Sequence, residues 1–229
     1  MSGSEKVKSS VIVPLDGMSE KESLDLAQRL QGLVWGFKVN DLLVTSGVQI
    51  VRKLKSFGSV FADPKFYDIP NTVGNSVGRL VDAGADLITI HASGGATMIE
   101  AAVASAGQSK ILAVTLLTSF SSQQVKSIYG VDVESGVSSL AKIAIDSGAH
   151  GIVCSPNELS ILPKSDSNYL KVTPGIRPSW YGESDDQQRT STPVGALKNG
   201  ATHLVIGRPI VRHANPVDAI ALIADELSD

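Results

Sequence analysis

Eight short apolar runs are spaced along the chain, and each is typical of a β-strand. They are nearly continuous in apolar residues rather than alternating, which is the pattern of parallel strands that are covered on both faces. The runs are Val11–Pro14, Leu33–Val39, Val60–Lys65, the apolar part of 83–91, Ile111–Leu117, the apolar part of 147–155, Tyr169–Thr173 and the apolar part of 199–207.

Amphipathic segments between these runs predict helices. Ser19 and Glu22 have the spacing of a capping box, ahead of a helix that continues to about Leu30. The segments Val44–Phe57 and Asn71–Gly84 are expected to be further helices. Strands and helices therefore alternate through most of the chain.

Three segments repeat one plan, in which a helix ends at Gly, Ala follows, and a short apolar strand begins. They read AGADLITIH (83–91), SGAHGIVCS (147–155) and NGATHLVIG (199–207). Eight βα units in one chain predict an α/β protein, a single-domain (β/α)8 TIM barrel. A doubly wound sheet is the alternative, but it normally carries a glycine-rich phosphate turn after its first strand, and PLDGMSE is not one.

The domain is expected to cover 1–229, since no linker or low-complexity tract divides the chain. Residues 1–9 are polar and are expected to form a short N-terminal extension. No apolar segment has the length of a bilayer-spanning helix, and the start of the chain does not resemble a signal peptide.

Composition narrows the possible partners. The net charge is −3 and the basic residues are scattered, so neither a nucleic acid nor a membrane surface is expected as a partner. One cysteine, Cys154, can form no disulfide within the chain and excludes a multi-cysteine metal site. A cytoplasmic location is the resulting expectation.

Polar residues follow most of the predicted strands. Catalytic groups of TIM barrels lie at the carboxyl ends of the strands, so these residues are the candidates for a site. No second histidine or carboxylate at ligand spacing accompanies His91, so we expect it to be structural and expect no metal site. The residues at strand ends are Asp16, Lys38, Asp63, Lys65, His91, Thr118, Ser119, Arg177 and Arg208.

The densest cluster of charge lies in VFADPKFYDIPNT (60–72). Asp63 and Lys65 are two positions apart on a strand and are expected to point to the same face. Asp68 follows in a turn that Pro70 announces. Such charges are costly to bury unless they pair, and an Asp-x-Lys pair alone is also typical of a structural ion pair.

Glycine and arginine residues that follow two later strands predict a phosphate site. TPGIRP (173–178) and IGRPI (206–210) each place Gly and Arg just beyond a strand, where backbone N–H groups and a guanidinium can meet an oxyanion. The polar segment Ser179–Thr192 between them is long for a simple connection. We interpret it as a lid with Gln187 facing the phosphate; a loop without a role is the alternative.

Together these motifs resemble the orotidine 5'-phosphate decarboxylase family. The resemblance rests on Asp63-x-Lys65-x-x-Asp68-Ile-Pro-Asn-Thr72 and extends over nearly the whole chain. FKVN, LLTS, TPGIRP, the DDQQR lid and IGRPI follow in the family's order. Two departures are Pro64, where the family usually has Leu and where a proline removes a ladder donor, and Gln188, where Lys is common.

The resemblance implies decarboxylation of orotidine 5'-monophosphate to uridine 5'-monophosphate, without cofactor or metal. Lys65 would supply positive charge and the proton, Asp63 would face the departing carboxylate, and Asp63, Asp68 and Lys38 would complete the charged array. A homodimer is also implied, in which Asp68 and Thr72 reach the neighbouring subunit's site. The remaining substrate contacts would be Asp16 and Lys38 to the ribose, Thr118 to the pyrimidine, and Arg177, Gln187, Gly207 and Arg208 to the phosphate.

Two other functions stay open at this point. The Asp-x-Lys-x-x-Asp motif is shared with metal-dependent sugar-phosphate decarboxylases and aldolases of the same superfamily. A barrel that only binds a phosphorylated ligand is the third possibility, and Pro64 is the feature that favours it.

Overall fold

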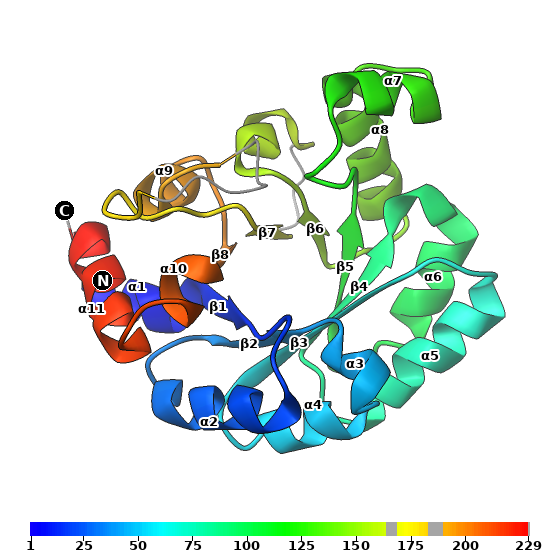
Figure 1. Ribbon diagram of the computed structural model, residues 1–229. Coiled ribbons are helices and arrows are strands. Elements are labelled where there is room, and N and C mark those ends of the chain that lie inside the picture. Colours follow the sequence, from blue (N-terminus) through cyan, green and yellow to red (C-terminus); the bar gives the residue numbers. More distant parts are fainter. Residues whose placement is uncertain (164–168, 183–189, 229) are drawn as a thin grey trace.

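The computed structural model describes residues 1–163, 169–182 and 190–228. Eight parallel strands form a closed barrel in which each strand pairs with its neighbour in sequence and β8 pairs with β1 (Figure 1). This confirms the predicted (β/α)8 barrel and excludes the doubly wound sheet. The strands are β1 (Val11–Pro14), β2 (Gly36–Val39), β3 (Ser59–Phe66), β4 (Leu87–His91), β5 (Lys110–Val114), β6 (Gly151–Val153), β7 (Leu170–Thr173) and β8 (His203–Val205).

Helices surround the barrel and connect its strands (Figure 1). The predicted capping box is present at the start of α2, where the Ser19 hydroxyl accepts from the Glu22 N–H and the Glu22 carboxylate accepts from the Ser19 N–H. The α-helices are α1 (Gly3–Ser10), α2 (Glu20–Leu30), α3 (Leu42–Thr45), α4 (Gln49–Leu54), α5 (Pro70–Asp82), α6 (Ala96–Ala104), α7 (Ser122–Tyr129), α8 (Val133–Asp146), α9 (Pro193–Lys198), α10 (Arg208–Val211) and α11 (Pro216–Ser228). Two 3-10 helices are η1 (Ala92–Gly94) and η2 (Pro156–Ile161).

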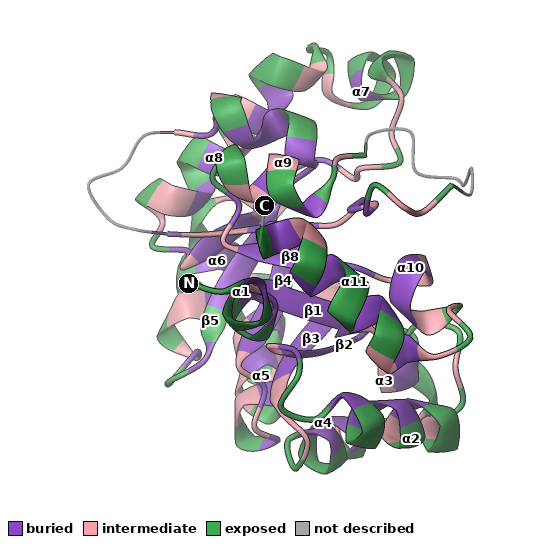
Figure 2. Ribbon diagram, turned by 90° about the vertical axis from the view of Figure 1, so that its left-hand side faces the viewer, coloured by how far each residue is buried: buried purple, intermediate pink, exposed green. Residues whose placement is uncertain are grey.

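The strands are apolar on both faces because they separate two apolar layers. A large cluster lies between the sheet and the helices. A smaller cluster fills the barrel and consists of Ile12, Phe61, Leu87, Leu112, Val172 and Val205. Figure 2 shows the strands as a mostly buried centre behind helices that expose one face. This packing explains why the strands read as continuous apolar runs.

The expectation of one helix over Val44–Phe57 was wrong. The chain forms α3 and α4 instead, and Gly47 between them has φ +59. That left-handed conformation is easily reached by glycine and interrupts a right-handed helix. The amphipathic pattern continues across the break because both short helices pack on the same core.

The segment expected to be a short polar extension, residues 1–9, is mostly helical. Residues Gly3–Ser10 form α1, which begins with a capping box between Ser2 and Glu5 and lies against α11. Gly3 makes the close approach possible, because a Cβ there would lie 1.8 Å from the Ala224 carbonyl oxygen. The Lys6 ammonium also donates to the Leu227 carbonyl of α11 at 2.6 Å.

Within the part of the chain that the structure describes, no helix combines the length and the apolar character needed to cross a membrane.

Candidate active site

A cavity of about 440 Å³ opens at the carboxyl ends of the strands. Its size is in the range of sites for small-molecule ligands. The cavity brings together most of the residues predicted from the sequence, although they lie as far apart in the chain as the ends of β1 and β8. The predicted residues that line it are Asp16, Lys38, Asp63, Lys65, Thr118, Arg177, Gly207 and Arg208.

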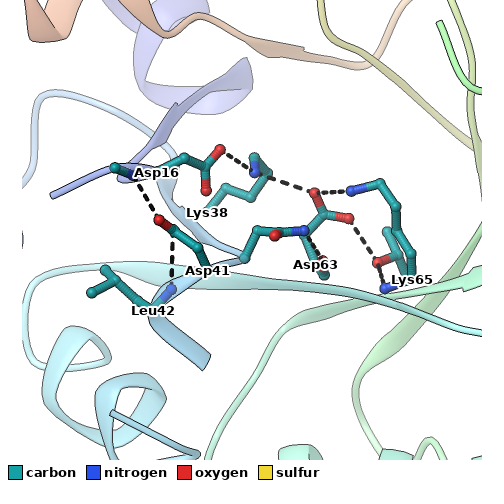
Figure 3. Close-up of polar contacts among 9 residues, drawn as sticks. Asp16, Lys38, Asp41, Leu42, Asp63 and Lys65 are labelled. Atoms are coloured by element: carbon teal, nitrogen blue, oxygen red, sulfur yellow. Dashed lines mark hydrogen bonds and ion pairs between the residues drawn. The ribbon is translucent and has the colours of Figure 1, made fainter. Parts of the chain in front are cut away.

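Side chains of alternating charge form a continuous row across the ends of β1, β2 and β3 (Figure 3). The Lys38 ammonium lies 2.7 Å from Asp16 Oδ2 and 3.2 Å from Asp63 Oδ2. The Lys65 ammonium lies 2.7 Å from the same Asp63 Oδ2. Asp63 is therefore a carboxylate held between two ammonium groups, and its side chain is only 8% exposed.

Burial and charge act in opposite directions on Lys38. Burial disfavours the ammonium form and lowers the pKa, but the carboxylates of Asp63 and Asp16 favour that form and together outweigh burial. The pKa of Lys38 consequently lies above its ordinary value. Lys38 is thus a fixed positive charge beside Asp63 at neutral pH.

The backbone of β3 is irregular where it carries this array. Pairing with β4 shifts register between Ala62, which pairs with Ile88, and Phe66, which pairs with Ile90. Lys65 lies inside the irregularity with φ +51. Among the described residues it is the only one other than glycine that has a positive φ. Such conformations are uncommon for residues with a side chain and occur preferentially at functional sites.

Pro64 falls within the same irregularity. A proline in a regular central strand would remove a ladder hydrogen bond, but prolines are accommodated at bulges because a residue there needs no ladder partner. The register of β3 against β4 has no partner for position 64. Pro64 is therefore compatible with the close contact between Lys65 and Asp63.

Two residues that contact Asp63 were not predicted. The Thr89 hydroxyl, on β4, donates to Asp63 Oδ1 at 2.8 Å, and the Asn40 amide, after β2, donates to the Asp63 carbonyl at 2.7 Å. Thr89 is a polar residue inside the apolar run LITIH and is fully buried. That mismatch was the signal in the sequence, since a buried hydroxyl requires a partner.

The opposite side of the cavity is formed by the ends of β7 and β8, where Gly175, Arg177, Gly207 and Arg208 line it. The segment after β7 is closed at its base, because the Arg177 N–H donates to the Ser191 carbonyl at 2.8 Å. A Cβ on Gly207 would lie 3.1 Å from the Pro14 side chain, so this loop passes close to β1. Arg212, which was not predicted, lines the same side.

The structure does not bring every predicted residue to the cavity. Asp68 and Thr72 are exposed and do not line it, and in the described chain no ion pair joins Asp68 to Lys65. Asp68 instead accepts a hydrogen bond from the Ile69 N–H at 2.6 Å, because it lies in the loop beyond the strand. The predicted phosphate contact Gln187, and Gln188 beside it, lie outside the described residues.

His91 ends β4 close to the charged array. Its ring lies edge-on to Tyr67, with 5.9 Å between ring centroids. Burial and the nearby Lys65 lower the pKa of His91, against a smaller opposing effect of Asp63. In the described ranges no group of three or more His, Cys, Asp or Glu side chains is placed to hold a metal ion.

The fold and the site define a class of protein: a (β/α)8 barrel with an Asp–Lys array facing a glycine- and arginine-rich pocket across one cavity. Comparison with family models then identifies the family within that class. Residues 9–223 match the model of the orotidine 5'-phosphate decarboxylase / HUMPS family, and the chain belongs to this family. The predicted family is thereby confirmed.

Individual relatives agree with this placement. A protein of Dichelobacter nodosus named orotidine 5'-phosphate decarboxylase is 40% identical over 224 residues, which cover 94% of this chain and 97% of the relative. One of Gloeothece citriformis with the same name is 38% identical and covers 97% of this chain and 99% of its own length. The crystal structure of orotidine 5'-phosphate decarboxylase from Lactobacillus acidophilus superposes with a TM-score of 0.80 at 34% identity and covers 96% of this chain and 99% of its own.

Proposed function

We propose that this protein decarboxylates orotidine 5'-monophosphate to uridine 5'-monophosphate and CO2, the last step of de novo pyrimidine synthesis. The observation that carries the proposal is the Lys65 ammonium, 2.7 Å from Asp63, in the same cavity as Arg177 and Arg208. Membership of the orotidine 5'-phosphate decarboxylase / HUMPS family supports it.

The reaction requires a positive charge and a proton donor near the ring carbon, and Lys65 can supply both. The bond between the pyrimidine ring and the carboxylate breaks, CO2 leaves, and the electron pair remains on the ring carbon. A fixed cation beside that carbon stabilises the developing charge, and the Lys65 ammonium then donates its proton to the carbon. The neutral amine regains a proton from water before the next turnover.

Asp63 and Lys38 hold Lys65 in place for this step. Asp63 Oδ2 accepts from both ammonium groups, so Lys65 is directed by a carboxylate that Lys38 also fixes. Asp63 would lie against the substrate carboxylate, and departure of CO2 relieves the repulsion between the two anions. Because binding of the rest of the substrate offsets this repulsion, the contact acts on the ground state more than on the transition state.

Substrate binding is assigned to the rest of the cavity. Asp16 and Lys38 would contact the ribose, and Thr118 the edge of the pyrimidine. Arg177, Gly207 and Arg208, with Gln187 from the segment between β7 and α9, would hold the phosphate. Arg177 and Arg208 line the cavity across the barrel from β3, which suits a substrate whose phosphate and carboxylate are at opposite ends.

A homodimer with shared sites is part of the proposal. Asp68 and Thr72 do not line the cavity of their own chain, and they would reach the site of the neighbouring subunit. The exposed side chains that flank Asp68 support an interface at this loop: Tyr67 is 65% exposed and Ile69 is 66% exposed. Apolar side chains of this size are typical of surfaces that become buried on association.

Mixed dimers test the shared site. The Lys65→Ala and Asp68→Ala variants, each of which we expect to be inactive alone, are co-expressed with different tags and the mixed dimer is purified. Shared sites predict restored activity, because one site then contains Lys65 from one chain and Asp68 from the other. No activity in the mixed dimer would contradict the shared site.

The reaction itself is tested by the loss of the orotate chromophore in the ultraviolet on addition of enzyme. We expect turnover of the nucleotide that a chelator does not reduce, and no turnover of sugar phosphates. Activity only on sugar phosphates with a divalent ion would favour the metal-dependent relatives. Binding of the nucleotide without turnover would favour a binding protein.

A cytoplasmic location and independence of cofactors complete the proposal. The location rests on the single cysteine, Cys154, which can form no disulfide within the chain. Independence of cofactors rests on the chemistry above, in which Lys65 supplies both the positive charge and the proton.

A further inference from the structure

We propose that Thr89 is a positioning residue that sets the orientation of both Asp63 and Lys65. The inference rests on the proposed function, in which those two residues act on the substrate. It assigns a role to a buried hydroxyl on β4 that does not line the cavity.

The roles of the Thr89 hydroxyl as acceptor and donor are fixed by its two partners. The Lys65 N–H can only donate, and it points to Thr89 Oγ1 at 3.0 Å. The Asp63 carboxylate can only accept, and its Oδ1 lies 2.8 Å from the same Oγ1. The hydroxyl therefore accepts from the backbone of Lys65 and gives its single proton to Asp63.

The bond to Asp63 determines which carboxylate oxygen meets the lysines. With Oδ1 held by Thr89, Oδ2 is the oxygen that faces Lys65 at 2.7 Å and Lys38 at 3.2 Å. Rotation of an aspartate carboxylate about its last torsion is otherwise broad. Without the hydroxyl, Oδ1 would be a buried acceptor without that donor, and the carboxylate would turn to find another.

The bond to Lys65 supports its unusual backbone. Lys65 has φ +51 inside the irregular part of β3, and its N–H is bonded to the Thr89 side chain. Strained conformations persist only where the surroundings hold them in place. Asn40 holds the other side of the same segment through the Asp63 carbonyl, at 2.7 Å.

Three single variants test this role. Thr89→Val keeps the shape and removes the hydroxyl, Thr89→Ser keeps the hydroxyl, and Thr115→Val is the matched control. Thr115 is also fully buried, in the segment after β5, and its hydroxyl lies 3.5 Å from the Val153 carbonyl and makes no bond to Asp63 or Lys65.

We expect Thr89→Val to lower kcat about 10- to 100-fold while KM changes less than about threefold, because misplacement of reacting groups acts on the chemical step. Thr89→Ser should recover most of kcat, and Thr115→Val should have the kcat of the parent protein. A parental kcat in Thr89→Val, with only a lower melting temperature, would overturn the inference. So would a Thr89→Ser variant as slow as Thr89→Val.

A double-mutant cycle separates action through Asp63 from a general effect on the fold. If Thr89 acts through Asp63, Thr89→Val should lower the residual kcat of Asp63→Asn much less than it lowers that of the parent. Fully additive effects would show that Thr89 does not act through Asp63 and would overturn that part of the inference. Activity retained in Lys65→Ala would instead remove Lys65 from the proposed mechanism, whereas an inactive Lys65→Ala beside a fully active Thr89→Val would remove only the role of Thr89.

Discussion

The two ends of the barrel are built on opposite principles. At the carboxyl ends of the strands, Asp63 and Lys38 are buried charges, and Lys65 has a left-handed backbone. At the other end, neutral rings fill the space: Trp35, before β2, meets His203 of β8 edge-on, with 5.1 Å between ring centroids. Trp35 also packs against the apolar cluster inside the barrel.

The difference separates what the fold needs from what the reaction needs. Buried charges and a strained backbone cost stability, and they are retained where they serve a site. Apolar and neutral aromatic packing stabilises the fold without chemistry. We therefore expect substitutions at the charged end to change turnover more than stability, and substitutions at the aromatic end to do the reverse.

The largest effect is expected at Lys65. Lys65→Ala should lower kcat by about 10⁴-fold or more, because in the proposed mechanism it removes both the fixed cation and the proton donor. Asp63 keeps its contact with Lys38, so the protein should stay folded. Turnover measured with circular dichroism on the same sample checks both statements. A variant that unfolds would break the separation of the two ends, and one that stays active would remove Lys65 from the mechanism.

Arg208 should have a smaller effect on the same reaction. Arg208→Ala should lower kcat/KM by about 10²- to 10³-fold, because it weakens the proposed charge-assisted contact to the phosphate but leaves the Asp–Lys array intact. The substrate analogue without phosphate provides the control, and parent and variant should process it equally slowly. A loss larger than that of Lys65→Ala would reverse the proposed division between the two sides of the cavity.

The aromatic end should respond to pH through stability. Burial lowers the pKa of His203 to about 4, so between pH 6.5 and 4 the unfolded chain binds a proton that the folded chain does not. Stability from this residue is therefore complete above the unfolded pKa and is lost as the pH falls, by about 2 kcal/mol between pH 7 and pH 5.

Denaturant unfolding of the parent and of His203→Gln at both pH values measures this contribution as a difference. The variant should lose about 2 kcal/mol less than the parent on going from pH 7 to pH 5. Carboxylates that titrate in the same range are present in both proteins, so their contributions cancel. Equal losses in the two proteins would show that His203 is protonated in the folded state at pH 5.

The smallest effect is expected at Pro64. Pro64→Leu should lower the free energy of unfolding by about 0.5 kcal/mol, because proline restricts the unfolded chain and its position in β3 requires no ladder donor. The kcat should change less than about threefold, which is below 1 kcal/mol in activation free energy. A tenfold change in kcat would mean that proline itself shapes the backbone of Lys65.

The sequence by itself determined the order of strands and the residues at their ends. Continuous apolar runs report strands that are buried on both faces, so eight βα units were recognisable from local pattern alone. In a barrel the end of each strand faces the same cavity, so Asp16, Lys38, Asp63 and Arg208 could be grouped although they are distant in the chain.

Only the tertiary structure decided how these residues meet. The predicted pairing of Asp63 with Lys65 is present, but it is reached through an irregular strand and a positive φ rather than through simple alternation. The contact of Thr89 with both residues depends on the register of β4 against β3, which no local pattern contains. The docking of α1 on α11 likewise depends on the absence of a side chain at Gly3, a fit between two ends of the chain that periodicity cannot report.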